Sequence, residues 1–320
     1  MKKYNIGIDL GGTKILCVLT DEKTNKIDFE VKKKTKKIKG NKNVIQKIYE
    51  AIDELLKISN VNKSQINSIG VAAAGQIDRN SGVLLYSCNL ECVNLNIKEL
   101  LECKYGIKTV VGNDVEVSAI AEMIQGAGKD YNNMVCIFVG TGVGSSVIID
   151  RKLVLGATGT AGELGHTIVQ ADGRMCTCGE AGCLEAYASR TAIETRIEGM
   201  IKKGEYSIIA DICDTQNIST KHLKEALDAH DRVVTKCVDD AIKYLSVGIA
   251  NVINFLNPEL IILGGGIIQG IDEFYVKTVR SSKEKSLLIA SEKTEFKKAE
   301  LGDYSGVIGA SMLEKYYNAV

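Results

Sequence analysis

The sequence predicts an α/β protein of two domains, and three observations lead to this prediction. Short segments rich in Val and Ile alternate with longer amphipathic segments, a pattern typical of strands and helices in layered domains. Residues 135–150 match residues 6–21 without gaps at an offset of 129, which indicates a repeated strand-turn-strand unit. The length of 320 residues is enough for two domains of ordinary size.

The composition is typical of a soluble globular protein, with 45% hydrophobic and 25% charged residues. Lys plus Arg and Asp plus Glu both number 40, so no global field favours nucleic acid or a membrane surface. The apolar runs are too short to span a bilayer, and Asp9 interrupts the only early one. We therefore expect a cytoplasmic protein that binds neither nucleic acid nor a membrane.

One strong local charge is the lysine-rich segment 32–39, which includes Lys36 and Lys37. A solvated edge strand and turn is the favoured interpretation, because natural edge strands often carry lysines. A patch that binds phosphate or nucleic acid is the alternative, and the sequence does not assign this segment a role.

Residues 4–21 predict a hairpin whose turn binds phosphate. Gly11 and Gly12 let backbone N–H groups approach an anion closely, while Thr13 adds a hydroxyl donor and Lys14 a positive charge. Asp9, at the end of the first strand, could hold a hydrated Mg²⁺ beside that phosphate. Taken alone, glycines that serve only a tight hairpin turn are the alternative.

The repeated unit predicts a second turn of the same kind, formed by Gly140, Thr141, Gly142 and Gly144. Two phosphate-binding turns, one in each domain, indicate ATP as a ligand. Two similar hairpins without a ligand remain the simpler alternative.

Between the two hairpins, the sequence predicts a helix at 44–58, a strand at 66–78 and a helix from Leu95 onward. A further strand then ends at Asn113 and Asp114, directly before another helix, where α/β sheets commonly place ligand-binding groups. Asp114 has the properties of a general base that removes a proton from a ligand hydroxyl, and Asn113 could hydrogen-bond to the same hydroxyl. A helix cap is the alternative role for Asp114.

The segment 158–189 carries four candidate metal ligands: His166, Cys176, Cys178 and Cys183. Three thiolates and one imidazole suit tetrahedral Zn²⁺, and a site closed by four protein ligands is structural. Buried cysteines and a core histidine are the alternative. Glu163 and Glu185 bracket the cluster, so we expect the metal to fix two carboxylates around a polyhydroxylated ligand.

The remaining segments predict helices at 190–203 and at 222–254, the second broken gently at Gly248. A strand then ends in Gly264, Gly265 and Gly266, which would let a planar ring lie against the backbone; a tight strand-to-helix turn is nearly as good an explanation. A terminal helix is expected to return to the first domain. The predicted domains are 1–112 with 303–320, and 113–302.

The motifs DLGGTK, AAGQID, GND, FVGTGVG, GELGH, CTCGEAGCLEAYAS, LGGG and GDYSGVIGA resemble, in this order, those of the ROK family. That family contains sugar kinases and sugar-responsive repressors with the actin/hexokinase/Hsp70-like ATPase fold, built from ribonuclease H-like domains. The cysteine-rich motif is similar to that of the glucokinase branch. The resemblance covers nearly the whole chain.

The resemblance implies a role for each matching position. Asp114 would be the catalytic base, and the sugar would be bound by Gly75, Asn89, Asn113, Glu163, His166 and Glu185. ATP and Mg²⁺ would be held by Asp9, the turn at Gly11, Gly12, Thr13 and Lys14, and the turn at Gly140, Thr141, Gly142 and Gly144. The adenosine would be bordered by Gly264, Gly265 and Gly266.

The implied reaction is transfer of a phosphoryl group from ATP to the primary hydroxyl of a hexose, with glucose the first choice. N-acetylmannosamine, N-acetylglucosamine, fructose and mannose are the alternative substrates. A different class of function is a non-catalytic sugar sensor related to the repressors; these carry a DNA-reading arm ahead of the first hairpin, whereas here the hairpin starts within the first few residues. Relatives are commonly dimers, so a homodimer is expected.

Overall fold

The fold is described from a computed structural model that covers residues 2–35 and 38–319. Contacts divide the chain into two compact units, one running up to Lys129 and resuming at Asp303, the other spanning Asp130–Gly302. The expected domains differ in placing residues 113–129 with the second part. The helix in this segment belongs to the first unit because it packs so closely on the terminal helix that a Cβ at Gly309 would overlap the Val117 carbonyl oxygen.

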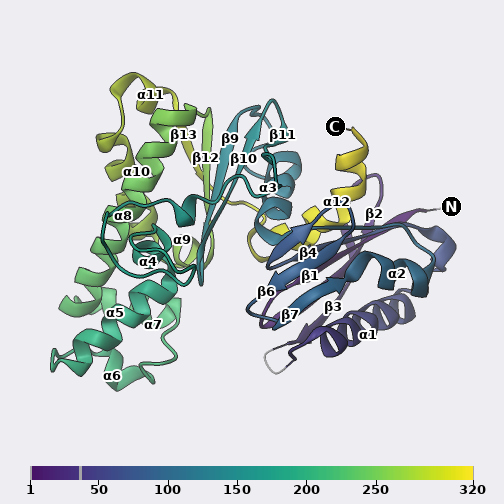
Figure 1. Cartoon of the computed structure of the whole chain (residues 1–320), viewed down its shortest axis with the longest axis horizontal. Helices are drawn as coiled ribbons and strands as arrows, with labels where there is room; N and C mark the ends of the chain where they lie inside the picture. The colour runs from purple at the N-terminus through teal and green to yellow at the C-terminus, as the bar shows by residue number, and fades with distance from the viewer. Residues whose placement is uncertain (1, 36–37, 320) are drawn as a thin grey trace. The chain divides into compact units, whose positions relative to one another are not determined.

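The first unit is an α/β layer structure (Figure 1). Its elements are β1 (Tyr4–Leu10), β2 (Lys14–Asp21), β3 (Ile27–Lys34), α1 (Asn41–Ser59), η1 (Lys63–Gln65), β4 (Ile66–Ala73), β5 (Gln76–Asp78), β6 (Val83–Ser87), β7 (Cys92–Asn96), α2 (Ile97–Tyr105), β8 (Thr109–Asn113), α3 (Asp114–Gln125) and α12 (Ser305–Ala319), the last preceded by the short turn η3 (Gly302–Tyr304).

The main sheet of this unit has the strand order β3-β2-β1-β4-β8. β2 runs antiparallel to β1 and β3, whereas β4 and β8 run parallel to β1. Side chains alternate between the two faces of a strand, so Ile6 and Ile8 are buried on the face that α1 and α2 cover. Gly7 points to the opposite face, where a Cβ would overlap the Val307 carbonyl oxygen of α12. The terminal helix therefore does return to the first unit.

The lysine-rich segment begins on β3, which is the edge strand of this sheet. Lys33 pairs with Glu54, and Lys39 with Glu91, on the surface. These contacts agree with the interpretation of a solvated edge, while Lys36 and Lys37 lie outside the described residues. A small separate sheet, β5-β6-β7, follows β4 in the chain and was not predicted.

The second unit repeats the arrangement of an antiparallel hairpin beside parallel strands. Its sheet has the order β11-β10-β9-β12-β13, with β9 antiparallel to β10 and parallel to β12. Its elements are β9 (Met134–Val139), β10 (Val143–Ile149), β11 (Lys152–Leu153), η2 (Leu164–His166), α4 (Glu185–Ala188), α5 (Arg190–Lys202), α6 (Ile209–Ile212), α7 (Thr220–Asp228), α8 (Arg232–Leu256), β12 (Leu260–Gly264), α9 (Gly266–Gly270), α10 (Asp272–Lys285), α11 (Leu288–Lys293) and β13 (Glu295–Lys298).

Two predicted helix positions were wrong. Leu95 lies in strand β7, and α2 starts only after the Asn96 cap, whose side chain accepts a hydrogen bond from the Glu99 N–H. The segment 222–254 is not broken at Gly248: α7 ends at Asp228, and α8 begins after Asp231, whose carboxylate caps it at 2.9 Å from the Val234 nitrogen. Gly248 instead gives room to the Leu184 side chain, which would lie 2.6 Å from a Cβ there.

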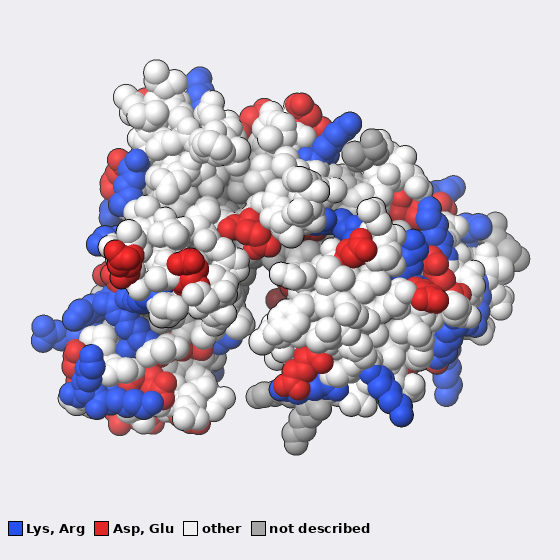
Figure 2. Space-filling model, viewed as in Figure 1, with Lys and Arg blue, Asp and Glu red and all other residues white. Residues whose placement is uncertain are grey.

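The surface matches the balanced charge of the sequence. Figure 2 shows Lys and Arg side chains interspersed with Asp and Glu over the face it presents. Among the described residues, no helix is both long enough and apolar enough to cross a membrane.

Candidate active site

The first glycine turn joins β1 to β2, and three hydrogen bonds fix its shape. The Gly11 N–H donates to the Lys14 carbonyl oxygen at 3.0 Å, which closes the turn. The chain after β3 supports it, because the Thr35 hydroxyl donates to the Gly11 carbonyl oxygen at 3.0 Å and the Thr35 N–H to that of Thr13 at 2.9 Å. The turn is therefore held by neighbours that do not use the Gly12 N–H.

Asp9 and Lys14 flank this turn and carry its charge. Burial, followed by the charge of Asp114, raises the pKa of Asp9 to about 6. Lys14 acts in the opposite direction, and its ammonium group pairs with Asp303 at 3.0 Å. A buried carboxylate whose pKa is raised by a neighbouring carboxylate lies in an environment that a divalent cation would relieve, so the residues present fit the expected Mg²⁺.

Asn113 and Asp114 stand where β8 gives way to α3, and the structure separates their roles. The Asn113 side chain is the cap of α3, because its Oδ1 accepts hydrogen bonds from the Val115 N–H at 2.9 Å and the Glu116 N–H at 3.3 Å. Asp114 is the first residue of the helix itself. The cap alternative considered for Asp114 therefore belongs to Asn113.

The Asp114 carboxylate remains partly accessible, while the surrounding protein controls its charge. Burial raises its pKa above the ordinary value, and the Glu116 charge adds to the rise, whereas a hydrogen bond from the Val115 N–H at 3.0 Å opposes it. A carboxylate with a raised pKa is a better proton acceptor than an ordinary Asp. This is the electrostatic setting that a general base needs.

Two further predicted sugar-binding positions lie beside these groups. The Asn113 Nδ2 donates to the Gly75 carbonyl oxygen at 3.1 Å, and Gly75 has φ +146 with no room for a Cβ against Tyr86. Asn89 lies against the first turn, since a Cβ at Gly12 would be 3.0 Å from the Asn89 Cβ. The first unit thus brings Gly75, Asn113 and Asp114 together at one end of the sheet, and Asn89 to the turn.

The second glycine turn joins β9 to β10, and Glu185 supports it directly. The Gly140 N–H donates to the Gly142 carbonyl oxygen at 2.9 Å. Glu185 Oε2 accepts a hydrogen bond from the Val143 N–H at 2.9 Å, and a Cβ at Gly142 would overlap that carboxylate. Glu185 was predicted as a sugar ligand, and in the structure one of its oxygens also holds this turn in place.

Thr141 and Gly144 are the other two residues predicted for this turn. Thr141 Oγ1 lies 3.5 Å from an Arg190 guanidinium nitrogen, and Gly144 continues into β10.

Gly265 has φ +93 and lies so close to Val139 that a side chain would overlap the backbone. Gly264 and Gly266 flank it at the start of α9. The tight-turn explanation therefore accounts for Gly265, and a ligand is not needed to explain it.

The four predicted metal ligands converge. The candidate ligand atoms of His166, Cys176, Cys178 and Cys183 all lie within 4.8 Å of one another. The Cys178 and Cys183 sulfurs are 3.7 Å apart, and Cys176 Sγ is 3.8 Å from His166 Nδ1. Bonds of 2.0–2.3 Å in a tetrahedron separate ligand atoms by about 3.3–3.8 Å, so this donor set fits Zn²⁺.

The loop around this cluster has few apolar contacts of its own. Met175 and Ile168 are exposed, and Gly182 is packed against the Gln170 backbone. Glu163 and His166 are exposed at the two ends of the short helical turn η2. The Ser145 side chain connects β10 to this turn, because it accepts a hydrogen bond from the Leu164 N–H at 3.1 Å.

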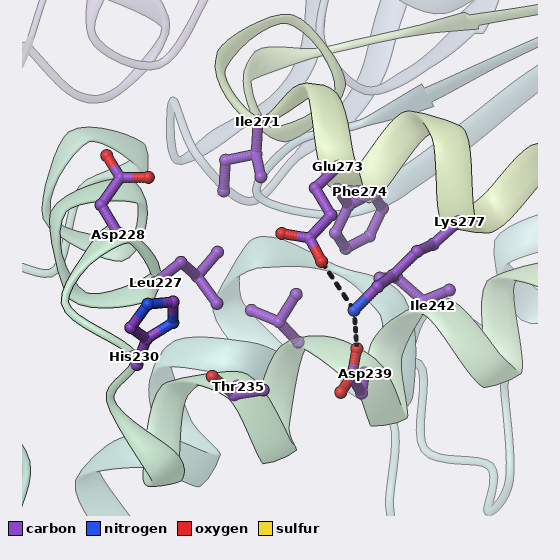
Figure 3. A pocket seen from close by; sticks show the side chains of 11 residues that line it. Leu227, Asp228, His230, Thr235, Asp239, Ile242, Ile271, Glu273, Phe274 and Lys277 are labelled. Carbon is purple, nitrogen blue, oxygen red and sulfur yellow. Dashed lines mark hydrogen bonds and ion pairs between the residues drawn. The ribbon is translucent and has the colours of Figure 1, made fainter.

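A separate pocket of about 350 Å³ lies in the second unit between the end of α7, α8 and α10 (Figure 3). Its floor is apolar, and at its rim the Lys277 ammonium group pairs with Asp239 and Glu273. None of the predicted site residues lines it.

The sequence analysis missed two charged partners of the site. Arg79 pairs with Glu116, two residues after Asp114, and Asp303 pairs with Lys14. Glu116 carried a weak signal, because it stands in the first turn of a helix that begins at the expected base. Arg79 and Asp303 carried none, since both partners come from remote parts of the chain.

A model of the ROK family matches residues 5–316. A glucokinase from Halalkalibacterium halodurans is 32% identical over 98% of this chain and 95% of its own length. A ROK family glucokinase from Streptomyces griseus, solved with glucose and AMPPNP, superposes with a TM-score of 0.80 at 27% identity, over 97% of this chain and 98% of its own.

A transcriptional regulator is also similar. A ROK family regulator, a homolog of the E. coli MLC protein, superposes with a TM-score of 0.87 at 25% identity and covers 99% of this chain but 78% of its own length. The same fold therefore occurs in kinases and in regulators.

Proposed function

The chain belongs to the ROK family, and we propose that it is an ATP-dependent sugar kinase that phosphorylates glucose at its primary hydroxyl to give glucose 6-phosphate. The observation that carries this proposal is the gathering of Asp114, Asp9 and the Gly11–Lys14 turn in one unit, with a raised pKa on both carboxylates. Similarity over nearly the full length of a glucokinase supports the choice of sugar. The fold proposed is the actin/hexokinase-like ATPase fold with ribonuclease H-like domains.

The first unit supplies the base and part of the sugar site. Asp114 accepts the proton of the primary hydroxyl, and the hydroxyl oxygen then attacks the γ-phosphorus of ATP in line. Gly75, Asn89 and Asn113 bind other sugar hydroxyls. The N–H groups of the Gly11–Lys14 turn, with Lys14, bind phosphate oxygens as negative charge develops on them.

The second unit supplies the remaining contacts. Glu163, His166 and Glu185 bind hydroxyls near the anomeric end, while Gly140, Thr141, Gly142 and Gly144 form the second phosphate turn. Gly264, Gly265 and Gly266 border the adenosine. Mg²⁺ bound with the nucleotide would neutralise phosphate charge, and Asp9 would hold its water shell.

Zn²⁺ is proposed to be structural, held by His166 Nδ1 and by the sulfurs of Cys176, Cys178 and Cys183. Burial raises the pKa of the Cys183 thiol to about 12, so the charge of a bound ion would be needed to keep that sulfur ionised. The ion would orient His166 and hold the loop between Glu163 and Glu185.

A cytoplasmic homodimer is the proposed state of the protein. Several large apolar side chains at the end of α8 and the start of α11 are exposed, among them Phe255, Leu288 and Ile289. Such a surface suits a contact between two copies of the chain. A molar mass of one chain by light scattering in solution would refute the dimer.

The test of the function is ADP release by the purified protein with Mg-ATP, measured against glucose, mannose, fructose, N-acetylglucosamine and N-acetylmannosamine. Turnover with glucose, reduced about 10²- to 10⁴-fold in Asp114→Asn, is the expected result, because the variant keeps the shape but loses the base. Turnover with another sugar of the panel, and none with glucose, would assign that sugar as the substrate. Sugar binding without turnover on any of them would favour the sugar sensor, the function class of the similar regulator.

A further inference from the structure

A charged pair lies next to the proposed base. Arg79 follows strand β5, and its guanidinium group contacts both carboxylate oxygens of Glu116, with Nε 3.2 Å from Oε2 and a second contact to Oε1. Glu116 is only 7% exposed. A two-point contact between a guanidinium and a buried carboxylate fixes both the direction and the position of the two side chains.

The pair connects two segments that carry the proposed sugar site. The β5–β6 hairpin directly follows Gly75, whose carbonyl oxygen is held by Asn113 at 3.1 Å. Arg79 forms a second connection from this hairpin to the first turn of α3, through Glu116. Asp114 therefore lies in the chain between Asn113, which is tied to Gly75 just before the hairpin, and Glu116, which is tied to Arg79.

The pair also controls the charge around Asp114. Glu116 is a charge that raises the pKa of Asp114, after the larger effect of burial. Tyr317 on α12 is close to the same pair, since burial and then Glu116 raise its pKa to about 12 while Arg79 opposes the rise. On β1, the Asp9 carboxylate interacts electrostatically with Asp114, and the charges of Lys14 on β2 and of Asp303 also act on the pKa of Asp9. The guanidinium of Arg79 is the positive charge in direct contact with Glu116.

We propose that Arg79 is a positioning residue for the kinase reaction, which holds the first turn of α3 against the sugar-side hairpin and neutralises the Glu116 carboxylate beside the base. This inference rests on the proposed function, in which Asp114 is the base. Glu116 acts through the same contact. Neither residue needs to touch the sugar or ATP.

The experiment compares the pH dependence of kcat/KM for glucose in four proteins: the wild type, Arg79→Met, Glu116→Gln and the double variant. Arg79→Met leaves the Glu116 charge acting on Asp114 without its counterion. The acid limb of the profile, where kcat/KM falls as Asp114 becomes protonated, should therefore move to higher pH by about 0.5–1 pH unit. Glu116→Gln removes that charge and should move the limb down by a similar amount. The double variant replaces an ion pair with two neutral side chains and should return toward the wild-type limb.

Two more variants separate charge from geometry. Arg79→Lys keeps the charge but loses the two-point contact, so the limb should stay near the wild-type pH while kcat falls about 10- to 100-fold from the misplaced base. The matched control is Arg196→Met, which removes another part-buried arginine pair, on Asp240 of the second unit, where Arg174 remains as a partner. This control should keep the wild-type acid limb.

A titration of the Asp114 carboxyl by ¹³C NMR, assigned with Asp114→Asn, gives the same comparison without turnover. Opposite shifts of its pKa in Arg79→Met and Glu116→Gln support the inference even if another sugar is the substrate. An unchanged pKa in both folded variants, with only their thermal stability reduced, would overturn it. Absence of turnover in the wild type with shifted NMR titrations would instead refute the proposed reaction and leave the coupling of Arg79 to Asp114 intact.

Discussion

At the level of single residues, Asp9 shows how the proposed reaction conflicts with stability. Its pKa in the folded protein is raised from 3.8 to about 6, mainly by burial. Folding therefore disfavours its charged form, and this unfavourable contribution is fully present above pH 6 and fades as the pH falls toward 4. The carboxylate is kept in a place where the fold alone would prefer a neutral group.

Asp9→Asn should therefore stabilise the free protein by about 1–3 kcal/mol at pH 8, with a gain that shrinks below pH 6, and should lower the kinase rate. Chemical denaturation at several pH values measures the gain. Asp21→Asn is the matched control, because backbone hydrogen bonds from Thr24 and Lys23 lower the pKa of Asp21 to about 2. It should destabilise at pH 8, and a destabilised Asp9→Asn would contradict the argument.

At the level of elements, the segment 158–189 is a loop that brings its four candidate metal ligands together, and we propose that a bound ion orders it. Its helical parts are short, and Leu164, Leu184 and Ala188 are its buried side chains in the apolar core of the second unit. Glu185 connects it to the second glycine turn through the Val143 N–H, so disorder in the loop should also reach that turn.

Cys176→Ser should reduce bound zinc from about one ion per chain to near zero, because the four-ligand site loses a thiolate. The loop should then be cut faster by protease, and sugar-dependent ADP release should fall by at least about tenfold. Cys213→Ser, which changes a half-buried cysteine outside the cluster, should leave zinc content and cleavage unchanged. Full zinc content in Cys176→Ser would disprove the assigned ligand set.

At the level of the whole molecule, the last helix completes the first unit. α12 covers the face of the main sheet opposite to α1, and glycines in the strands allow the contact. A Cβ at Gly70 would overlap the Ala310 carbonyl oxygen, and one at Gly7 would overlap that of Val307. Segments near the two ends of the chain thus belong to one unit, with the entire second unit inserted between them in the sequence.

Gly70→Ala should destabilise the protein by about 2–4 kcal/mol, because the added methyl group forces α12 away from β4. The control is Gly199→Ala, at a helical position with nothing within 4 Å of the added Cβ, which should be neutral or stabilising by up to about 1 kcal/mol. Thermal unfolding of the two variants side by side measures the difference. Equal stability would mean that the helix adjusts freely.

Local patterns were sufficient for much of the fold and of the site. The repeat at an offset of 129 predicted the two hairpins that became β1–β2 and β9–β10, because Gly-rich turns between β-branched runs are local signals. The spacing of His166, Cys176, Cys178 and Cys183 predicted a cluster that the fold brings together. The break at Gly248 was wrong because helix propensity is a weak guide when packing, here against Leu184, requires a glycine.

By itself, the sequence determined the α/β class, the two glycine turns, the cluster of His166 with three cysteines and the position of Asp114 at a strand-to-helix junction. Only the tertiary structure decided which residue caps α3, that Glu185 supports the second turn, and that Arg79 pairs with Glu116 near Asp114. The physical reason is the distance along the chain over which each interaction acts. Turns and caps act within a few residues, whereas the burial of Asp9, the Asp114 charge that acts on it and the contact of Arg79 with Glu116 bring together segments far apart in the chain.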